Sequence, residues 1–211
     1  MSKQFWKWAK AESGSELILE GVIASESWWE DEVTPKLFRE QLAEKTGDIT
    51  VRINSPGGDV YAGMQLYNML NEHEGTVTVK VDGIAASAAS FVAMAGDKRI
   101  MLPGSMMMVH NSSTFAGGNK DELEKVIEML KAADESMVSI YTARTGQSEE
   151  RIRELLKAET WMTAQEAVEL GFADEAVEAK TSLADALAKI SELKATMQSA
   201  VLQPVMSIQA R

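Results

Sequence analysis

The sequence predicts an α/β protein, in which a mainly parallel β-sheet carries helices on its faces. Short apolar segments with the period of a strand alternate with helical segments along the first half of the chain. Alternation at this spacing is typical of βαβ units, whose parallel strands are joined by a crossover helix. The length of 211 residues and the 45% share of hydrophobic residues suit one domain with a core, with room for a short appendage.

Each element of this first half is identified by its period and by the residues at its ends. Thr34 and Pro35 begin a helix as N-cap and first helical residue, and Gly47 ends it. Asp59 caps a second helix, which closes near Gly75. An Ala/Ser-rich helix is expected to follow directly after residues 82–83 and to stop at residue 96. The expected strands are residues 16–23, 49–53, 76–81, 99–102 and 106–109.

A change of period marks the region after Asn119. Apolar side chains recur every three or four residues for about 25 positions, until Gly146. A helix of that length spans about 38 Å, more than a domain of this size needs. We therefore expect it to project from the body and to pack against another subunit, although a long surface helix on its own domain is the alternative. Ser148 begins a further helix, and Thr163 with Glu166 forms a capping box for a short one.

Residues 180–211 stand apart from this pattern and are expected to form a helical appendage, partly disordered, to a domain of residues 1–179. Apolar side chains recur there at helical spacing from Leu183 to Met197. A helix of this length is marginal in water without a partner.

The inventory of side chains excludes several chemistries. The chain has no cysteine and only two histidines, His73 and His110, which excludes disulfides, cysteine nucleophiles, thiolate metal sites and three-histidine zinc sites. A net charge of −11 argues against nucleic-acid binding, which needs a basic face. No signal peptide and no bilayer-spanning run of about 20 apolar residues stand out. We expect a cytoplasmic protein that binds no membrane.

Three segments between strands and helices carry candidate chemistry. In residues 54–58 (NSPGG), adjacent glycines permit positive φ and expose backbone N–H groups, although a tight turn explains them equally well. In residues 83–90 (GIAASAAS), small residues surround Ser87, whose alternative role is a helix N-cap. His110 ends a strand beside a loop, where a general base is expected, although a lone histidine is often structural. Ser90 is expected to satisfy its hydroxyl against the backbone, and His73 to lie at a solvated helix end.

Together these features fit one constellation: Ser87 as nucleophile, His110 as base, and the N–H groups of Gly57 and Ala88 as an oxyanion hole. In their order and spacing they resemble the Clp protease proteolytic subunit family, serine peptidases of the Clp/crotonase fold. The resemblance rests on INSPGG (53–58), GIAASAAS (83–90), AGDKR (95–99), MVH (108–110), TGQS (145–148) and TAQEAVELGFAD (163–174). Residues 24–29 (ASESWW) and 159–163 (ETWMT) are most similar to the phage and prophage branch, the Clp-like head maturation or prohead proteases.

The resemblance implies a Ser–His–acid triad that needs no metal or cofactor. Its acid corresponds to Glu159, where the family usually has Asp, and Asp174 is the fallback. The peptide substrate is expected to bind in extended form alongside Gly58, Asp59 and Val60.

The resemblance further implies an assembly. Members of the family stack two seven-membered rings through a handle, which corresponds here to residues 112–146, so a homo-oligomeric ring is expected. The leading hypothesis is a serine endopeptidase of phage head maturation, acting on capsid or scaffold protein in the host cytoplasm or the procapsid. The alternatives are a cellular-type degradative peptidase working with an ATPase unfoldase, a catalytically idle assembly protein and, more remotely, acyl-CoA chemistry on the shared fold.

Overall fold

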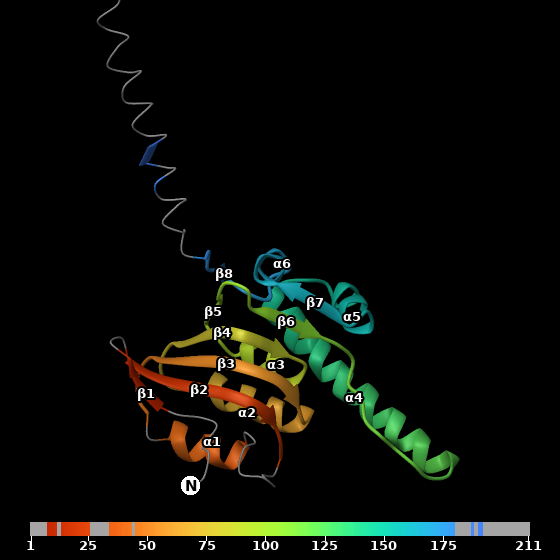
Figure 1. Ribbon diagram of the computed structural model, residues 1–211. Coiled ribbons are helices and arrows are strands. Elements are labelled where there is room, and N and C mark those ends of the chain that lie inside the picture. The colour runs from red at the N-terminus through yellow and green to blue at the C-terminus, as the bar shows by residue number, and fades with distance from the viewer. Residues whose placement is uncertain are drawn as a thin grey trace, which may run out of the picture. The chain divides into compact units, whose positions relative to one another are not determined.

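The computed structural model describes residues 8–11, 14–25, 34–43, 45–179, 187, 190 and 191 of the chain. The chain divides into two compact units, Met1–Val177 and Glu178–Arg211. The first unit contains the sheet and its helices (Figure 1). The predicted appendage lies almost wholly outside the described residues, as do residues 26–29 of the ASESWW segment.

The described strands form one eight-stranded sheet in the order β1-β2-β3-β4-β5-β8, with β6 paired to β4 and β7 paired to β6. Only β1–β2 and β6–β7 are antiparallel, and the other pairs are parallel. The mainly parallel α/β sheet confirms the predicted fold class. The strands are β1 (Trp8–Ala11), β2 (Gly14–Ile23), β3 (Ile49–Gly58), β4 (Val77–Ala86), β5 (Lys98–Met101), β6 (Met106–Val109), β7 (Thr160–Thr163) and β8 (Glu175–Ala176).

The helices begin where capping residues predict them. Asp59 accepts a hydrogen bond from Ala62 N–H, and Thr163 with Glu166 forms the expected capping box. Thr34 precedes Pro35 at the first helical position but makes no side-chain cap. The helices are α1 (Pro35–Leu42), α2 (Val60–Asn71), α3 (Ala88–Met94), α4 (Lys120–Thr145), α5 (Glu149–Lys157) and α6 (Ala164–Glu169).

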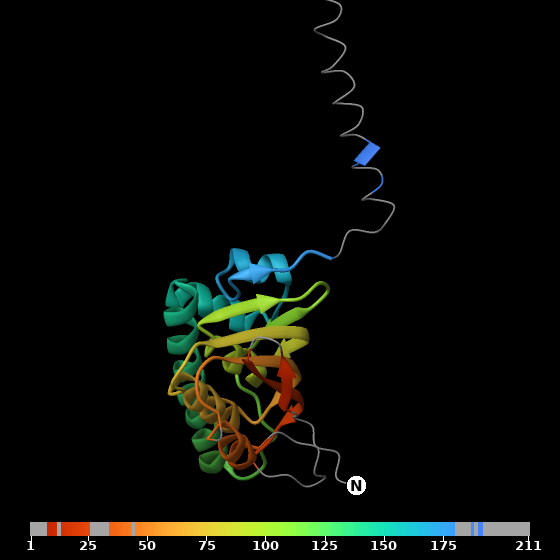
Figure 2. The same cartoon turned by 90° about the vertical axis from the view of Figure 1, so that its left-hand side faces the viewer.

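The core lies between the sheet and the helices α2 and α3 on one of its faces (Figure 2). Alternate side chains of β3 and β4 point into it, and every residue of α3 is buried. Each fully buried aliphatic side chain stabilises the fold by about 1.5–3 kcal/mol. Because α3 follows β4 directly, this packing fixes the junction between them at residue 87.

Two predicted strand ends are wrong, those of β3 and β4, and both lie next to Ser87. The NSPGG segment is strand rather than turn, since β3 continues to Gly58 and pairs with Ile23 of β2. Strand β4 runs on to Ala86 instead of ending at Val81, because β6 supplies a new parallel neighbour for it beyond that point. The prediction also missed β7, whose pairing with β6 is distant in sequence.

Helix α4 projects as predicted. None of residues 120–132 is buried, whereas Ala133, Met137, Val138 and Tyr141 are. In Figure 1 its N-terminal end extends past the sheet, beside the segment that leads into it. No helix within the described ranges is long and apolar enough to cross a membrane.

Candidate active site

Ser87 occupies a strained junction between β4 and α3. Its φ of 52° and ψ of −125° lie in a region that non-glycine residues rarely adopt, at a cost on the order of 1–3 kcal/mol. Its side chain makes no capping hydrogen bond, so the N-cap alternative does not explain this serine. A serine on a sharp strand-to-helix turn is instead typical of an exposed nucleophile.

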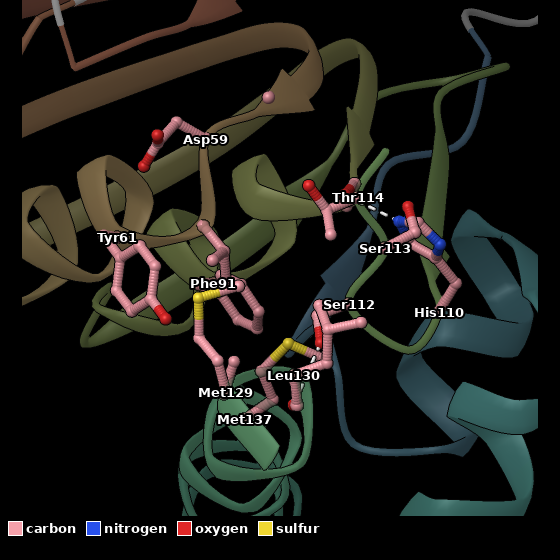
Figure 3. Close-up of a pocket in the computed structure, with 14 residues that line it drawn as sticks. Asp59, Tyr61, Phe91, His110, Ser112, Ser113, Thr114, Met129, Leu130 and Met137 are labelled. Atoms are coloured by element: carbon pink, nitrogen blue, oxygen red, sulfur yellow. Dashed lines mark hydrogen bonds between the residues drawn. The ribbon is translucent and has the colours of Figure 1, made fainter. Parts of the chain in front are cut away.

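His110 is the partner of the Ser87 hydroxyl. The distance from Ser87 Oγ to His110 Nε2 is 2.7 Å (Figure 3). Parallel pairing of β4 with β6 brings the two residues together, and Ser87 N–H also donates to Met108 O at 2.9 Å. If the hydroxyl donates, Nε2 is unprotonated and the ring proton sits on Nδ1. This is the arrangement in which histidine can take the serine proton.

Glu159 and His110 both lie just beyond the β6–β7 pairing, but no hydrogen bond or ion pair joins these two described side chains. Val109 pairs with Thr160 at the end of the antiparallel ladder, so His110 and Glu159 are the residues that adjoin this last pair. The Glu159 side chain is exposed, and its backbone has a φ of 49°. Within the described residues, no carboxylate forms a hydrogen bond or an ion pair with His110. The structure therefore shows a hydrogen-bonded Ser–His pair. The backbone of the predicted acid, Glu159, lies near that of His110.

Asp174, the fallback acid, is held by Arg99 instead. Its carboxylate accepts hydrogen bonds from Arg99 Nε at 3.0 Å, Nη2 at 2.6 Å and the backbone N–H at 2.7 Å. Burial raises the pKa of Asp174, but the hydrogen bonds from Arg99 outweigh this effect and hold that pKa below its ordinary value. Asp174 thus acts as an anchor between β5 and the chain before β8.

Gly57 lies close against Ser87. A Cβ on Gly57 would lie 2.5 Å from Ala86 O and 2.7 Å from Ser87 Cβ, and its φ is +93°. Its N–H, predicted as an oxyanion donor, donates to Ser55 Oγ at 3.1 Å, while Ser55 donates to Gly21 O at 2.6 Å. Gly57 therefore lets the strand pass close to Ser87, and its amide is engaged within the chain.

The N–H of Gly58 is directed differently from those of Gly57 and Asp59. Asp59 N–H donates to Ile23 O of β2 at 2.8 Å. Because N–H groups alternate in direction along a strand, the Gly58 N–H points away from β2. That direction leads toward β4, the strand that ends at Ala86 directly before Ser87.

A cavity of about 290 Å³ opens beside the Ser87–His110 pair. The predicted substrate segment, Gly58, Asp59 and Val60, lines one wall, and residues 112–114 line another. Figure 3 shows the side chains of Phe91, Met129 and Met137 gathered together on one side of the space. The cavity can hold an apolar side chain next to the Ser87 hydroxyl.

Sequence reasoning missed the contributions of α4 to this site. Ser112 donates from both its N–H and its Oγ to Asp134 Oδ1, each at 2.7 Å. Tyr141 reaches Ser90, whose hydroxyl binds the backbone as predicted, at Ser87 O. His73 contacts Gly47 O at 2.8 Å and takes no part in the site. The helical period showed which residues face inward but not which distant groups they meet.

The chain is similar along most of its length to proteins of one family. The family described as Clp protease matches residues 13–180. The chain is 32% identical over 167 residues to ATP-dependent Clp protease proteolytic subunit 2 of Rhodococcus jostii, covering 76% of this chain and 86% of that protein. The identity to the same subunit of Thermobifida fusca is 34% over 152 residues, covering 69% and 75%. A solved ClpP1 mutant from Listeria monocytogenes superposes with a TM-score of 0.67 at 26% identity, covering 78% of this chain and 92% of that one.

Proposed function

The chain belongs to the Clp protease family, whose proteolytic subunits are serine-type endopeptidases, and we propose that Ser87 and His110 carry out its peptide hydrolysis. The observation that carries this assignment is the 2.7 Å contact between Ser87 Oγ and His110 Nε2. The strained backbone of Ser87 and the adjoining cavity support it.

In the proposed reaction, His110 Nε2 takes the Ser87 proton as Oγ attacks the peptide carbonyl carbon. The same proton then passes to the leaving amine as the C–N bond breaks, which leaves an acyl group on Ser87. Water, deprotonated by His110, attacks that ester, and the released Oγ recovers its proton.

The oxyanion of the tetrahedral intermediate needs donors beside Ser87. We assign one to the Ala88 N–H, as the resemblance implied. Because the Gly57 amide donates to Ser55 Oγ, the Gly58 amide is better directed than Gly57 to be the second. Loss of one such donor typically costs on the order of 10²–10³ in rate.

Glu159 is the proposed third member of the triad. The pairing of Val109 with Thr160 supports this proposal, because Glu159 and His110 adjoin that pair and the Glu159 side chain is exposed. Accepting a hydrogen bond from His110 Nδ1 would fix the tautomer and stabilise the imidazolium ion. Glutamate has one more methylene than the aspartate usual in the family, so the carboxylate must fold back toward the ring.

The substrate is proposed to bind as an extended strand. Residues 58–60 and 112–114 line the cavity, and Figure 3 shows Asp59 on one side of it and Ser113 and Thr114 on the other. An extended peptide can lie between them with one side chain directed toward Phe91 and Met129. We expect an apolar residue at that position of the substrate.

For the biological role we propose head maturation, with capsid or scaffold protein as substrate and residues 180–211 as an appendage to a protease domain of residues 1–179. The resemblance of residues 24–29 and 159–163 to the phage branch supports it. The second candidate is degradation with an ATPase partner, since the curated relatives are named ATP-dependent subunits. In both roles the projecting part of α4 is proposed to join subunits into a ring.

A fluorophosphonate probe tests the nucleophile, because it reacts with activated serines. We expect the wild-type chain and the control Ser136→Ala, on the exposed side of α4, to be labelled, and Ser87→Ala to remain unlabelled. Labelling of Ser87→Ala would disprove the assignment. Specific cleavage of a co-expressed scaffold or capsid protein would support maturation, whereas casein degradation that depends on an added unfoldase and ATP would support the second role.

A further inference from the structure

The Ser87 carbonyl oxygen accepts a hydrogen bond from the last of two linked hydroxyl groups, which we call the relay. The relay begins at Tyr141 on α4. Ser90 Oγ lies 2.5 Å from Ser87 O and 2.5 Å from the Tyr141 hydroxyl oxygen. A serine hydroxyl has one proton to donate. Because Ser90 donates its proton to Ser87 O, the Tyr141 hydroxyl donates to Ser90 Oγ. The relay thus runs from Tyr141 through Ser90 to the backbone of the nucleophile.

Both hydroxyl groups are enclosed by protein. Ser90 is 0% exposed and Tyr141 is 1% exposed. The Tyr141 ring lies between Phe91 and Phe172, with ring centres 5.2 and 5.4 Å away. Burial raises the pKa of Tyr141 far above its ordinary value, so the phenol keeps its proton at neutral pH and remains a donor.

Stability alone does not require this pair. Every other residue of α3 is apolar, and replacing both partners of a buried hydrogen bond with apolar groups of similar shape is nearly neutral. What the pair adds is a second donor to Ser87 O, which also accepts from Ser90 N–H at 2.9 Å. Two donors on one carbonyl fix the direction of a peptide unit that φ and ψ place in a rarely populated region.

We propose that Ser90 and Tyr141 are positioning residues for peptide hydrolysis: they hold the Ser87 carbonyl, and with it the backbone angles that direct Oγ at His110. The inference rests on the proposed role of Ser87 as nucleophile. It makes α4 both a wall of the substrate cavity, through Met129 and Met137, and a support of the nucleophile.

Three variants test this inference: Tyr141→Phe, Ser90→Ala and the double variant. We expect each single variant to react with the fluorophosphonate probe about tenfold more slowly, with kcat lowered to match and KM unchanged, because Oγ is less well aimed. The double variant should be no slower than Ser90→Ala, since Tyr141 acts through Ser90. It should also regain the Tm lost in the singles, because no buried hydroxyl is left unpaired.

Tyr67→Phe on α2 is the matched control, since it loses the same hydroxyl from a partly buried ring outside the relay. We expect wild-type rates from it, with all rates compared on fractions of equal oligomeric mass. If the relay variants lose Tm but react at the wild-type rate, Ser90 and Tyr141 merely satisfy each other and the inference is overturned. Should a single variant fail to fold, the double variant still decides. Labelling of Ser87→Ala would instead show that the proposed nucleophile is wrong.

Discussion

At Gly57, a single hydrogen atom in place of a side chain lets β3 pass against Ser87, the proposed nucleophile. A Cβ there would also come within 2.8 Å of Ala88 N, so the strand or the junction would have to move. We expect Gly57→Ala to lower the rate of probe labelling by at least about 10²-fold, because the oxyanion donors and Oγ would both shift.

Gly104→Ala is the control for this substitution. Gly104 also has a positive φ, of +79°, but nothing lies within 4 Å of its Cβ position. The Gly104→Ala variant should lose about 1 kcal/mol of stability from backbone strain and should be labelled at the wild-type rate. Equal loss of labelling in the two variants would mean that strain rather than crowding is responsible.

No hydrogen bond joins the described side chains of Glu159 and His110, which gives a prediction about the triad. Because the Glu159 side chain is exposed, Glu159→Gln should leave Tm unchanged. If the carboxylate orients His110 during catalysis, kcat/KM for a peptide should fall by about 10² or more. Glu150→Gln on α5, also exposed, is the control and should change neither value. An unchanged kcat/KM in Glu159→Gln would reduce the site to a Ser–His dyad.

Asp174 makes a contribution to stability that depends on pH. Its pKa is lower in the folded chain than in the unfolded chain, where about 3.9 is usual. The stabilisation is therefore fully present above pH 4 and is lost as the pH falls through the lower folded pKa. Asp174→Asn should cost about 2 kcal/mol at pH 7, a value reduced because the Asp174 side chain is 37% exposed.

Denaturant unfolding of wild type and Asp174→Asn at pH 7 and at progressively lower pH measures this contribution. The difference between them should shrink with acidification, and the folded variant should keep its labelling rate at pH 7. Loss of labelling without loss of stability would instead make Asp174 catalytic.

At the scale of elements, α4 holds the chain that follows His110. The N–H and the Oγ of Ser112 both donate to the Asp134 carboxylate, and Ser112 Oγ also lies 3.1 Å from Leu130 O. Asp134→Ala should release residues 112–114, which line the cavity, from α4. We expect KM to rise about tenfold, because a factor of ten corresponds to the loss of one hydrogen bond to a charged group. Steady-state kinetics check this, with Glu135→Ala as control. That variant removes the same charge from the neighbouring position, where the partner is the exposed Arg153. A similar KM in both variants would contradict the prediction.

The elements also show which parts of the structure local sequence can predict. The caps at Asp59 and Thr163 join residues three positions apart, so their pattern is visible in the chain itself. The Ser90–Tyr141 contact joins residues 51 positions apart. Strand β7 likewise pairs with β6, which is distant in sequence, so neither contact is visible in local sequence. The contact between Ser87 and His110 could be predicted because both residues follow apolar strands, and parallel pairing of β4 with β6 brings such strand ends together. The hydrogen bond from the Gly57 amide to Ser55 Oγ could not be predicted, because the NSPGG segment was expected to be a turn rather than a strand.

At the scale of the whole molecule, the outer half of α4 is the main feature that the subunit alone does not explain. Leu123, Ile127 and Met129 are 38%, 50% and 42% exposed on a segment with no buried residue. A helix gains most of its stability from packing an apolar face, and this half packs little against its own subunit. Met129 also lines the cavity beside Ser87, so a partner on this half of the helix would lie close to the substrate.

We therefore expect Leu123→Ser with Ile127→Ser to lower the oligomeric mass measured by light scattering, while circular dichroism shows the fold retained. Loss of activity should accompany dissociation, because the wall formed by the outer part of α4 would no longer be supported. Val22→Ser removes an apolar side chain of similar exposure, 48%, from β2 and should leave the mass unchanged. If the α4 variant kept the wild-type mass, subunits would have to meet through another surface. The projecting helix would then serve the substrate cavity alone.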